Sequence, residues 1–330
     1  MILAILVTVS VLVSGGLIFR FVVSPMLAAR IAFSQAFVTG KRYPEDVDGN
    51  SLEGDFKESR KADIEDMQHA AFETVSITSD DGLKLAGRFY PSSGSASPVV
   101  ICFHGYRGTS VDDFCGIFGF LRHKDMALLM PDQRHQGHSE GKCMTFGIRE
   151  RFDVLCWIRW VKEHCGADRP IYLYGMSMGA ATVLMASELI DDNSVYGIIA
   201  DSAYTSADLV LFNTMKHHGV PVPRASYRIV SLGACMCGQF RPGAVHVPEA
   251  VKKAKAPILL LHGERDSCIP CEMSREIHTA NPDLIDLYTF PSAEHIMSCY
   301  TDPIRYRKIL SSFFFETCKK NNRNTRAITF

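Results

Sequence analysis

The stretch Ile171-Tyr172-Leu173-Tyr174-Gly175-Met176-Ser177-Met178-Gly179 joins a short apolar run to the pattern G-x-S-x-G. The run Ile171–Tyr174 is typical of a strand that is buried on both faces of a sheet. Met178–Ile190 follows it with the composition of a helix. A serine at such a strand-to-helix turn exposes its hydroxyl, and the flanking glycines leave room for the tight backbone. We therefore predict that Ser177 is a nucleophile. The alternative is that Ser177 is only a structural residue of the turn, without a catalytic role.

Strands and helices alternate on both sides of this stretch. Strands are predicted at Val99–Phe103, Ala127–Met130, Ile171–Tyr174, Val195–Ala200, Ile258–Leu261 and Ile285–Phe290. Helices are predicted at Val111–His123, Phe146–Cys165, Met178–Ile190, Met273–Ala280 and Ile304–Phe315. Alternating units of this kind form a mostly parallel sheet with helices on both faces. The sequence therefore predicts an α/β fold.

Two segments depart from this alternation. Glu73–Thr78 and Leu83–Tyr90 alternate polar and apolar residues around a turn, so we expect an antiparallel hairpin at one edge of the sheet. Residues 204–256 hold helical pieces and no clear buried strand, which indicates an insertion between two strands. We thus expect an N-terminal segment over residues 1–30, a charged lead-in over 31–73, and a catalytic domain over 74–330.

Two downstream loops carry groups that could activate Ser177. A serine hydroxyl is a weak nucleophile unless a base accepts its proton. His295 follows the last predicted strand, and Asp266 follows the strand before it. We predict that His295 is the general base and that Asp266 holds its imidazole in the useful tautomer. Glu264 and Asp201 remain competing acids.

The loop His104-Gly105-Tyr106-Arg107-Gly108 directly follows a predicted strand. Its glycines allow the backbone to approach a substrate closely. An oxyanion needs two fixed donors, which we expect to be the backbone N–H groups of Tyr106 and Met178. His104 and four residues of the insertion are candidates for contacting the substrate. The four residues of the insertion are Phe212, Met215, Met236 and Phe240.

Taken together, five motifs resemble the α/β-hydrolase superfamily, and most closely the membrane-anchored hydrolases of the serine aminopeptidase-like group. These motifs are His104–Gly108, Pro131–Ser139, Gly175–Gly179, His262–Asp266 and Glu294-His295. The resemblance implies an α/β-hydrolase fold with a short helical cap at residues 204–256. It also implies a triad of Ser177, Asp266 and His295. The chain departs from the family pattern at His135, where a glycine is usual.

These features favour a serine hydrolase that acts on an acyl ester or thioester without a metal or cofactor. An aminopeptidase on the same fold is the alternative, but it needs carboxylates in the cap to hold a substrate amine, and the cap contains only Asp208 and Glu249. A membrane-anchored binding protein without activity is a third possibility. Cys268 and Cys271 form a C-x-x-C pair beside the predicted acid, so a redox role also stays open.

The overall composition excludes other classes of protein. The chain has 330 residues and a net charge of −1, which argues against a nucleic-acid-binding protein. Its 11 cysteines are an odd number in a long chain, so free thiols in a reducing compartment are expected rather than a disulfide framework.

The N-terminal residues Met1–Phe19 carry no charged side chain. At about 1.5 Å per residue, a helix of this length comes close to the thickness of a bilayer core. We therefore predict a single membrane anchor, with a cleaved signal peptide and an interfacial helix as alternatives. Arg20, Arg30, Lys41 and Arg42 follow the segment, which favours a cytoplasmic catalytic domain. A chain that begins near Phe33 is expected to stay soluble and active.

Overall fold

The computed structural model describes residues 19–321 except 39, 51–53, 192, 218 and 220. Residues 1–18 of the predicted anchor therefore lie outside the described residues. Within the described part of the chain, no helix has both the length and the apolar composition that a membrane crossing requires.

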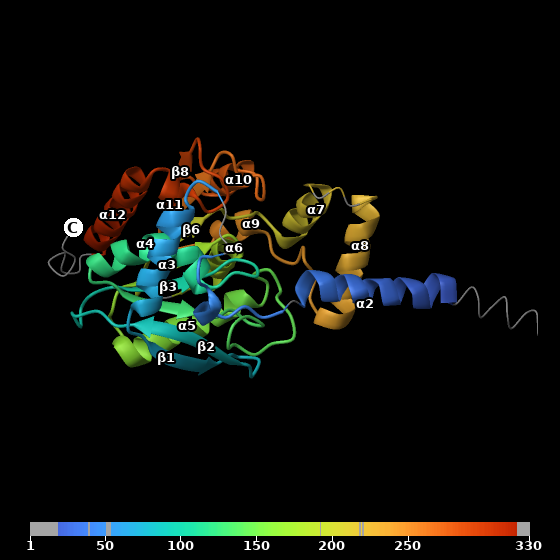
Figure 1. Cartoon of the computed structure of the whole chain (residues 1–330), viewed down its shortest axis with the longest axis horizontal. Coiled ribbons are helices and arrows are strands. Elements are labelled where there is room, and N and C mark those ends of the chain that lie inside the picture. The colour runs from blue at the N-terminus through green and yellow to red at the C-terminus, as the bar shows by residue number, and fades with distance from the viewer. Residues whose placement is uncertain are drawn as a thin grey trace, which may run out of the picture.

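One sheet of eight strands forms the centre of the molecule (Figure 1). Its spatial order is β1-β2-β4-β3-β5-β6-β7-β8. The strands are β1 (Glu73–Thr78), β2 (Lys84–Tyr90), β3 (Val99–Phe103), β4 (Ala127–Pro131), β5 (Ile171–Met176), β6 (Val195–Asp201), β7 (Ile258–Gly263) and β8 (Ile285–Phe290). Strands β1 and β2 are an antiparallel hairpin, β2 pairs antiparallel with β4, and the other pairs are parallel. The predicted fold class is thus confirmed.

Helices cover both faces of this sheet. The longer ones are α2 (Ser24–Phe37), α3 (Lys57–His69), α4 (Ser110–His123), α5 (Glu150–Cys165), α6 (Met178–Ala186), α7 (Ala207–His217), α8 (Pro223–Gly233), α10 (Glu272–Ala280) and α12 (Pro303–Lys320). The shorter ones are η1 (Phe19–Val23), η2 (Pro44–Asp46), η3 (Ser187–Leu189), η4 (Ala234–Gly238), α9 (Val247–Val251) and α11 (Ser298–Thr301).

Alternate residues of the central strands enter two separate cores. Ile101 and Leu173 belong to the core under α5 and α6, whereas Cys102 and Tyr174 belong to the core under α4 and α12. This follows from the period of two in a strand, which sends neighbouring side chains to opposite faces. Burial on both faces explains why these strands are continuous apolar runs rather than alternating ones.

The helix predicted from Phe146 begins four residues later, at Glu150. Phe146 and Gly147 have φ angles of 54° and 88°, which a helix does not accommodate. The Glu150 carboxylate accepts hydrogen bonds from the N–H groups of Thr145 and Gly147, at 2.7 and 2.9 Å. This turn closes the segment before the helix, so the prediction placed the start of the helix too early.

The N-terminal part of the chain packs on the insertion rather than on the sheet alone. Helix α2 crosses the predicted boundary between residues 30 and 31 and lies against α8 (Figure 1). The two helices approach closely at Gly233, where an added Cβ would lie 2.2 Å from the carbonyl oxygen of Ala29. Ala29, Phe33 and Phe37 form the buried stripe of α2.

Candidate active site

Ser177 lies at the turn between the central strand β5 and helix α6. Its backbone has φ 54° and ψ −115°, a conformation that costs energy for a residue with a side chain. The surroundings enforce it, because a Cβ on Gly175 would lie 2.2 Å from the Gly179 oxygen, and one on Gly179 would lie 1.8 Å from the Phe103 oxygen. Both glycines of the motif are therefore required by the close backbone packing, and the hydroxyl is held above the end of the strand.

His295 lies between Ser177 and Asp266. Its Nε2 is 3.0 Å from the Ser177 Oγ, and its Nδ1 is 2.6 Å from the Asp266 Oδ2. A carboxylate at Nδ1 assigns the proton to that nitrogen and leaves the Nε2 lone pair free to accept the serine proton. The geometry therefore brings together the three residues predicted from the sequence.

The Asp266 carboxylate is buried and fully hydrogen-bonded. Its Oδ1 accepts the N–H groups of Cys268 and Ile269 at 2.9 and 2.7 Å, and its Oδ2 lies 3.2 Å from the Nε2 of His262. Burial acts to raise the pKa of Asp266, but the hydrogen bonds from His262 and His295 outweigh it and lower the pKa. Asp266 is thus held as a carboxylate facing the imidazole.

The two competing acids make other contacts. Asp201 lies at the end of β6 and accepts hydrogen bonds from the hydroxyls of Tyr306 and Ser202, at 2.7 and 3.0 Å. Burial raises the pKa of its carboxyl. Glu264 accepts from the Thr289 hydroxyl and lies 3.4 Å from Arg275. Neither has a hydrogen bond to His295 within the described part of the chain.

The loop His104–Gly108 lies directly over the serine. A Cβ on Gly105 would come within 3.1 Å of the Ser177 Cβ, which explains the glycine. Met178 is the first residue of α6, so its N–H is one of the four that have no acceptor within the helix. Its place beside Ser177 suits the predicted role as an oxyanion donor.

Two residues that the sequence reasoning missed, one half-buried and one buried, hold this loop. The Asp113 carboxylate accepts the N–H of Gly105 at 2.5 Å, and the N–H of Gln133 donates to His104 Nε2 at 3.1 Å. Burial raises the pKa of Asp113. A sequence signal existed for Asp113, since Thr109 and Asp112 form a capping box that turns the first residues of α4 toward the loop.

His104 was predicted to contact the substrate, but both of its ring nitrogens are occupied inside the protein. Nδ1 lies 2.9 Å from the Gly105 oxygen, Nε2 accepts from Gln133, and the side chain is buried. Its position therefore suits the support of the oxyanion loop.

The four predicted pocket residues of the cap separate into two pairs. Phe212 and Met215 are half-buried on α7. Phe240 is buried, with its ring centroid 5.1 Å from that of Phe37, and Met236 is exposed. Phe240 thus packs α2 onto the cap, and the half-buried Met215 packs against the same core.

The departure from the family pattern at His135 is accommodated by the backbone. His135 has φ 64°, the left-handed region that glycine adopts most easily. Its N–H donates to the Glu140 oxygen at 2.9 Å, and its Nδ1 lies 3.1 Å from the Gly141 oxygen. The histidine therefore occupies the conformation expected of the usual glycine.

The C-x-x-C pair lies in the loop that carries Asp266, and the N–H of Cys268 donates to that carboxylate. Cys268 is exposed and Cys271 is buried, and both are free thiols whose pKa is raised by burial. A raised pKa disfavours the reactive thiolate, so the surroundings do not favour redox chemistry. Among the described residues, no cluster of at least three His, Cys, Asp or Glu side chains could hold a metal ion.

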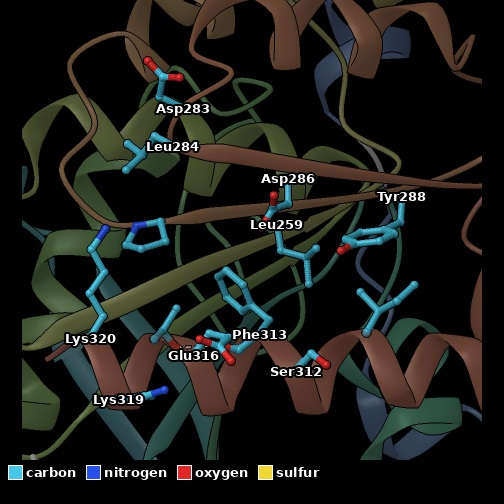
Figure 2. A pocket seen from close by; sticks show the side chains of 13 residues that line it. Leu259, Asp283, Leu284, Asp286, Tyr288, Ser312, Phe313, Glu316, Lys319 and Lys320 are labelled. Atoms are coloured by element: carbon cyan, nitrogen blue, oxygen red, sulfur yellow. Dashed lines mark hydrogen bonds between the residues drawn. The ribbon is translucent and has the colours of Figure 1, made fainter. Parts of the chain in front are cut away.

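A separate cavity of about 590 Å³ lies at the opposite end of the strands, between β7, β8 and α12. Figure 2 shows Leu259, Asp286 and Tyr288 of the strands facing Phe313 and Glu316 of the helix. Leu259 lies near the start of β7, whereas Asp266 follows its end. This cavity is therefore not part of the triad site.

Comparison with known proteins agrees with this fold. The sequence model of the alpha/beta hydrolase fold matches residues 98–223. The chain therefore has the α/β-hydrolase fold. An esterase of Pyrococcus furiosus, Pf2001, superimposes with a TM-score of 0.61 at 22% identity, covering 83% of this chain and 98% of that one.

Two curated relatives match different shares of the chain. YqkD of Bacillus subtilis is 24% identical over 298 residues, covering 88% of this chain and 93% of YqkD. The lysophosphatidylserine lipase ABHD12 of Danio rerio is 24% identical over 204 residues, covering 59% of this chain and 50% of the lipase. Esterases and a lipase among these similar proteins support a hydrolase.

Proposed function

We propose that this hydrolase cleaves acyl ester or thioester bonds through an acyl-enzyme on Ser177. The observation that carries the proposal is the continuous hydrogen-bonded chain from Ser177 through His295 to Asp266. A base within 3.0 Å of a hydroxyl, itself held by a buried carboxylate, is the arrangement that activates a serine.

The reaction follows from this arrangement. The Ser177 oxygen attacks the substrate carbonyl while His295 Nε2 accepts its proton, and Asp266 stabilises the imidazolium. The N–H groups of Tyr106 and Met178 hold the oxyanion. Collapse of the tetrahedral intermediate expels the alcohol or thiol, which takes the proton from His295. A water molecule deprotonated by His295 then releases the acid and restores Ser177.

An aminopeptidase is the second candidate, and one observation favours it. Oδ1 of Asp208 is buried and has no hydrogen-bond partner among the described residues. A substrate amine could supply this missing partner. The other carboxylate of the cap, Glu249, is paired with Lys252 at the surface. A single unpaired carboxylate supports the aminopeptidase less than the similar esterases support an esterase, so we rank ester hydrolysis first.

A substrate panel separates the two. Purified protein is assayed with p-nitrophenyl esters of increasing chain length and with aminoacyl p-nitroanilides, with the Ser177→Ala variant as the background control. Ester hydrolysis that exceeds anilide hydrolysis and vanishes in the variant supports the proposal. Faster hydrolysis of anilides with a free amine supports the aminopeptidase. If neither the esters nor the anilides are hydrolysed, the result favours the hypothesis of a binding protein without activity.

Membrane attachment and orientation are part of the proposal. The support is the uncharged run Met1–Phe19, the basic residues after it, and the odd number of cysteines in the sequence, which suits free thiols in a reducing compartment. We place the catalytic domain on the cytoplasmic side. Labelling of Cys235, Cys237 or Cys268 by a membrane-impermeant maleimide on intact cells would contradict this orientation.

A further inference from the structure

The described surface of the protein exposes its large apolar side chains mainly in one region. This region, which we call the lead-in–cap lobe, consists of residues 19–37 and of residues 207–238 without 218 and 220, and therefore of η1, α2, α7, α8 and η4. Nine of the fourteen exposed large apolar side chains among the described residues belong to it: Val22, Val23, Met26, Leu27, Ile31, Leu209, Val222, Leu232 and Met236.

Helix α2 supplies more apolar surface than its packing on the cap uses. Its buried stripe, Ala29, Phe33 and Phe37, already contacts the cap and the core. Leu27 and Ile31 project from the opposite side of the helix and are 54% and 52% exposed. Exposed apolar side chains such as these favour an apolar neighbour over water.

The charged side chains of the same lobe are almost all basic. Arg30, Lys216, Arg224 and Arg228 are exposed, and none of them pairs with a carboxylate in the part of the chain that the structure describes. Asp208 is the lobe's one acidic residue. Exposed apolar residues interspersed with Lys and Arg are typical of surfaces that lie on anionic lipid.

The position of the lobe in the chain points to the same partner. Only the short η1 separates helix α2 from the uncharged residues 1–18, and α2 lies with α8 at one end of the molecule, far from α12 (Figure 1). A second copy of this chain would bring the basic side chains of two lobes face to face, where their charges repel.

We propose that the lead-in–cap lobe docks on the surface of an anionic phospholipid bilayer. This contact is additional to the N-terminal anchor.

Native cysteines allow the test on the full-length protein. Cys235 and Cys237 are exposed within the lobe, and Cys268 is exposed outside it, beside Asp266. The protein is placed in phosphatidylcholine vesicles with or without phosphatidylglycerol, and mass spectrometry follows the alkylation of each cysteine by an impermeant maleimide. We expect Cys235 and Cys237 to react about tenfold more slowly when the anionic lipid is present, with Cys268 unchanged.

Charge-reversal variants make the test specific. Arg224→Glu combined with Arg228→Glu should abolish the protection, whereas Lys319→Glu combined with Lys320→Glu, at the far end of α12, should leave it intact. Equal rates in both kinds of vesicle would overturn the proposal. So would protection that appears without lipid and rises with protein concentration, because a second copy would then cover the lobe. Hydrolysis of a short soluble ester in the same samples reports the proposed chemistry separately.

Discussion

The hydroxyl of Tyr106 lies 2.8 Å from the carbonyl oxygen of Ala36, so the oxyanion loop is tied to the last turn of α2. The Arg107 guanidinium makes a parallel contact to the Gln35 oxygen, also at 2.8 Å. The last four carbonyls of a helix have no partner within it, and these two side chains supply one for each. Helix α2 therefore helps to hold the backbone that is expected to bind the oxyanion.

Removal of the Tyr106 hydroxyl should slow catalysis without weakening binding. In Tyr106→Phe the ring stays against Phe146, but the loop loses its bond to Ala36. We expect kcat to fall about tenfold with KM nearly unchanged, because a small misplacement of an oxyanion donor affects mainly the transition state. Steady-state kinetics with a p-nitrophenyl ester measures this. Tyr288→Phe, on β8, is the control and should behave as wild type.

The packing of α2 should also matter for stability. Phe37 is fully buried, and its ring contacts those of Phe33, Phe146 and Phe240. Phe37→Ala is expected to lower the free energy of unfolding by about 3–5 kcal/mol, whereas Phe152→Ala, on the exposed side of α5, should cost far less. Urea denaturation measures both. Equal losses would show that α2 is not part of the folded core.

The same packing changes the expectation for a shortened chain. A start near Phe33 removes Ala29, one of the three buried residues of α2, and a start at Lys41 removes the whole helix. We now expect the chain from Arg20 to keep its activity and the chain from Lys41 to lose it. Comparison of specific activities at equal amounts of folded protein tests this, and an active Lys41 chain would contradict it.

The assignment of the acid is tested by a matched pair of variants. Asp266→Asn removes the acceptor for His295 Nδ1–H and should lower kcat by about 10³- to 10⁴-fold, because the imidazole loses its orientation. Asp201→Asn keeps an oxygen for the Tyr306 hydroxyl and should cost much less. If Asp201→Asn proves the more damaging of the two, the acid has been misassigned.

The buried carboxyl of Asp201 should also make the free energy of unfolding depend on pH. Burial raises its pKa in the folded state above the unfolded value of about 3.9, so folding favours its protonated form. Its contribution to stability is fully present below the unfolded pKa and is lost as pH rises through the folded pKa. Above pH 4, the free energy of unfolding should therefore fall less steeply with pH in Asp201→Asn than in wild type. Urea titrations at several pH values measure the two slopes, and identical slopes would contradict the prediction.

The sequence was enough to predict the features that depend on local pattern. The G-x-S-x-G turn, the apolar strands and the hairpin all follow from spacing along the chain. Contacts between distant segments were out of reach. The bond from Tyr106 to Ala36 spans 70 residues, and nothing in either segment reveals it. Phe240 is apolar in the cap and was assigned to a pocket, because sequence cannot tell packing against Phe37 from packing against a substrate.

The central claim is that Ser177 is the nucleophile of an ester-cleaving triad. The most direct measurement combines mass-spectrometric mapping of a fluorophosphonate adduct with the hydrolysis rate of a p-nitrophenyl ester, in wild type and in Ser177→Ala. We predict a single adduct on Ser177, and a fall in kcat of at least about 10³-fold in the variant, because the triad acts as a unit. An adduct on another residue, or a variant that hydrolyses the ester as fast as wild type, would contradict the account.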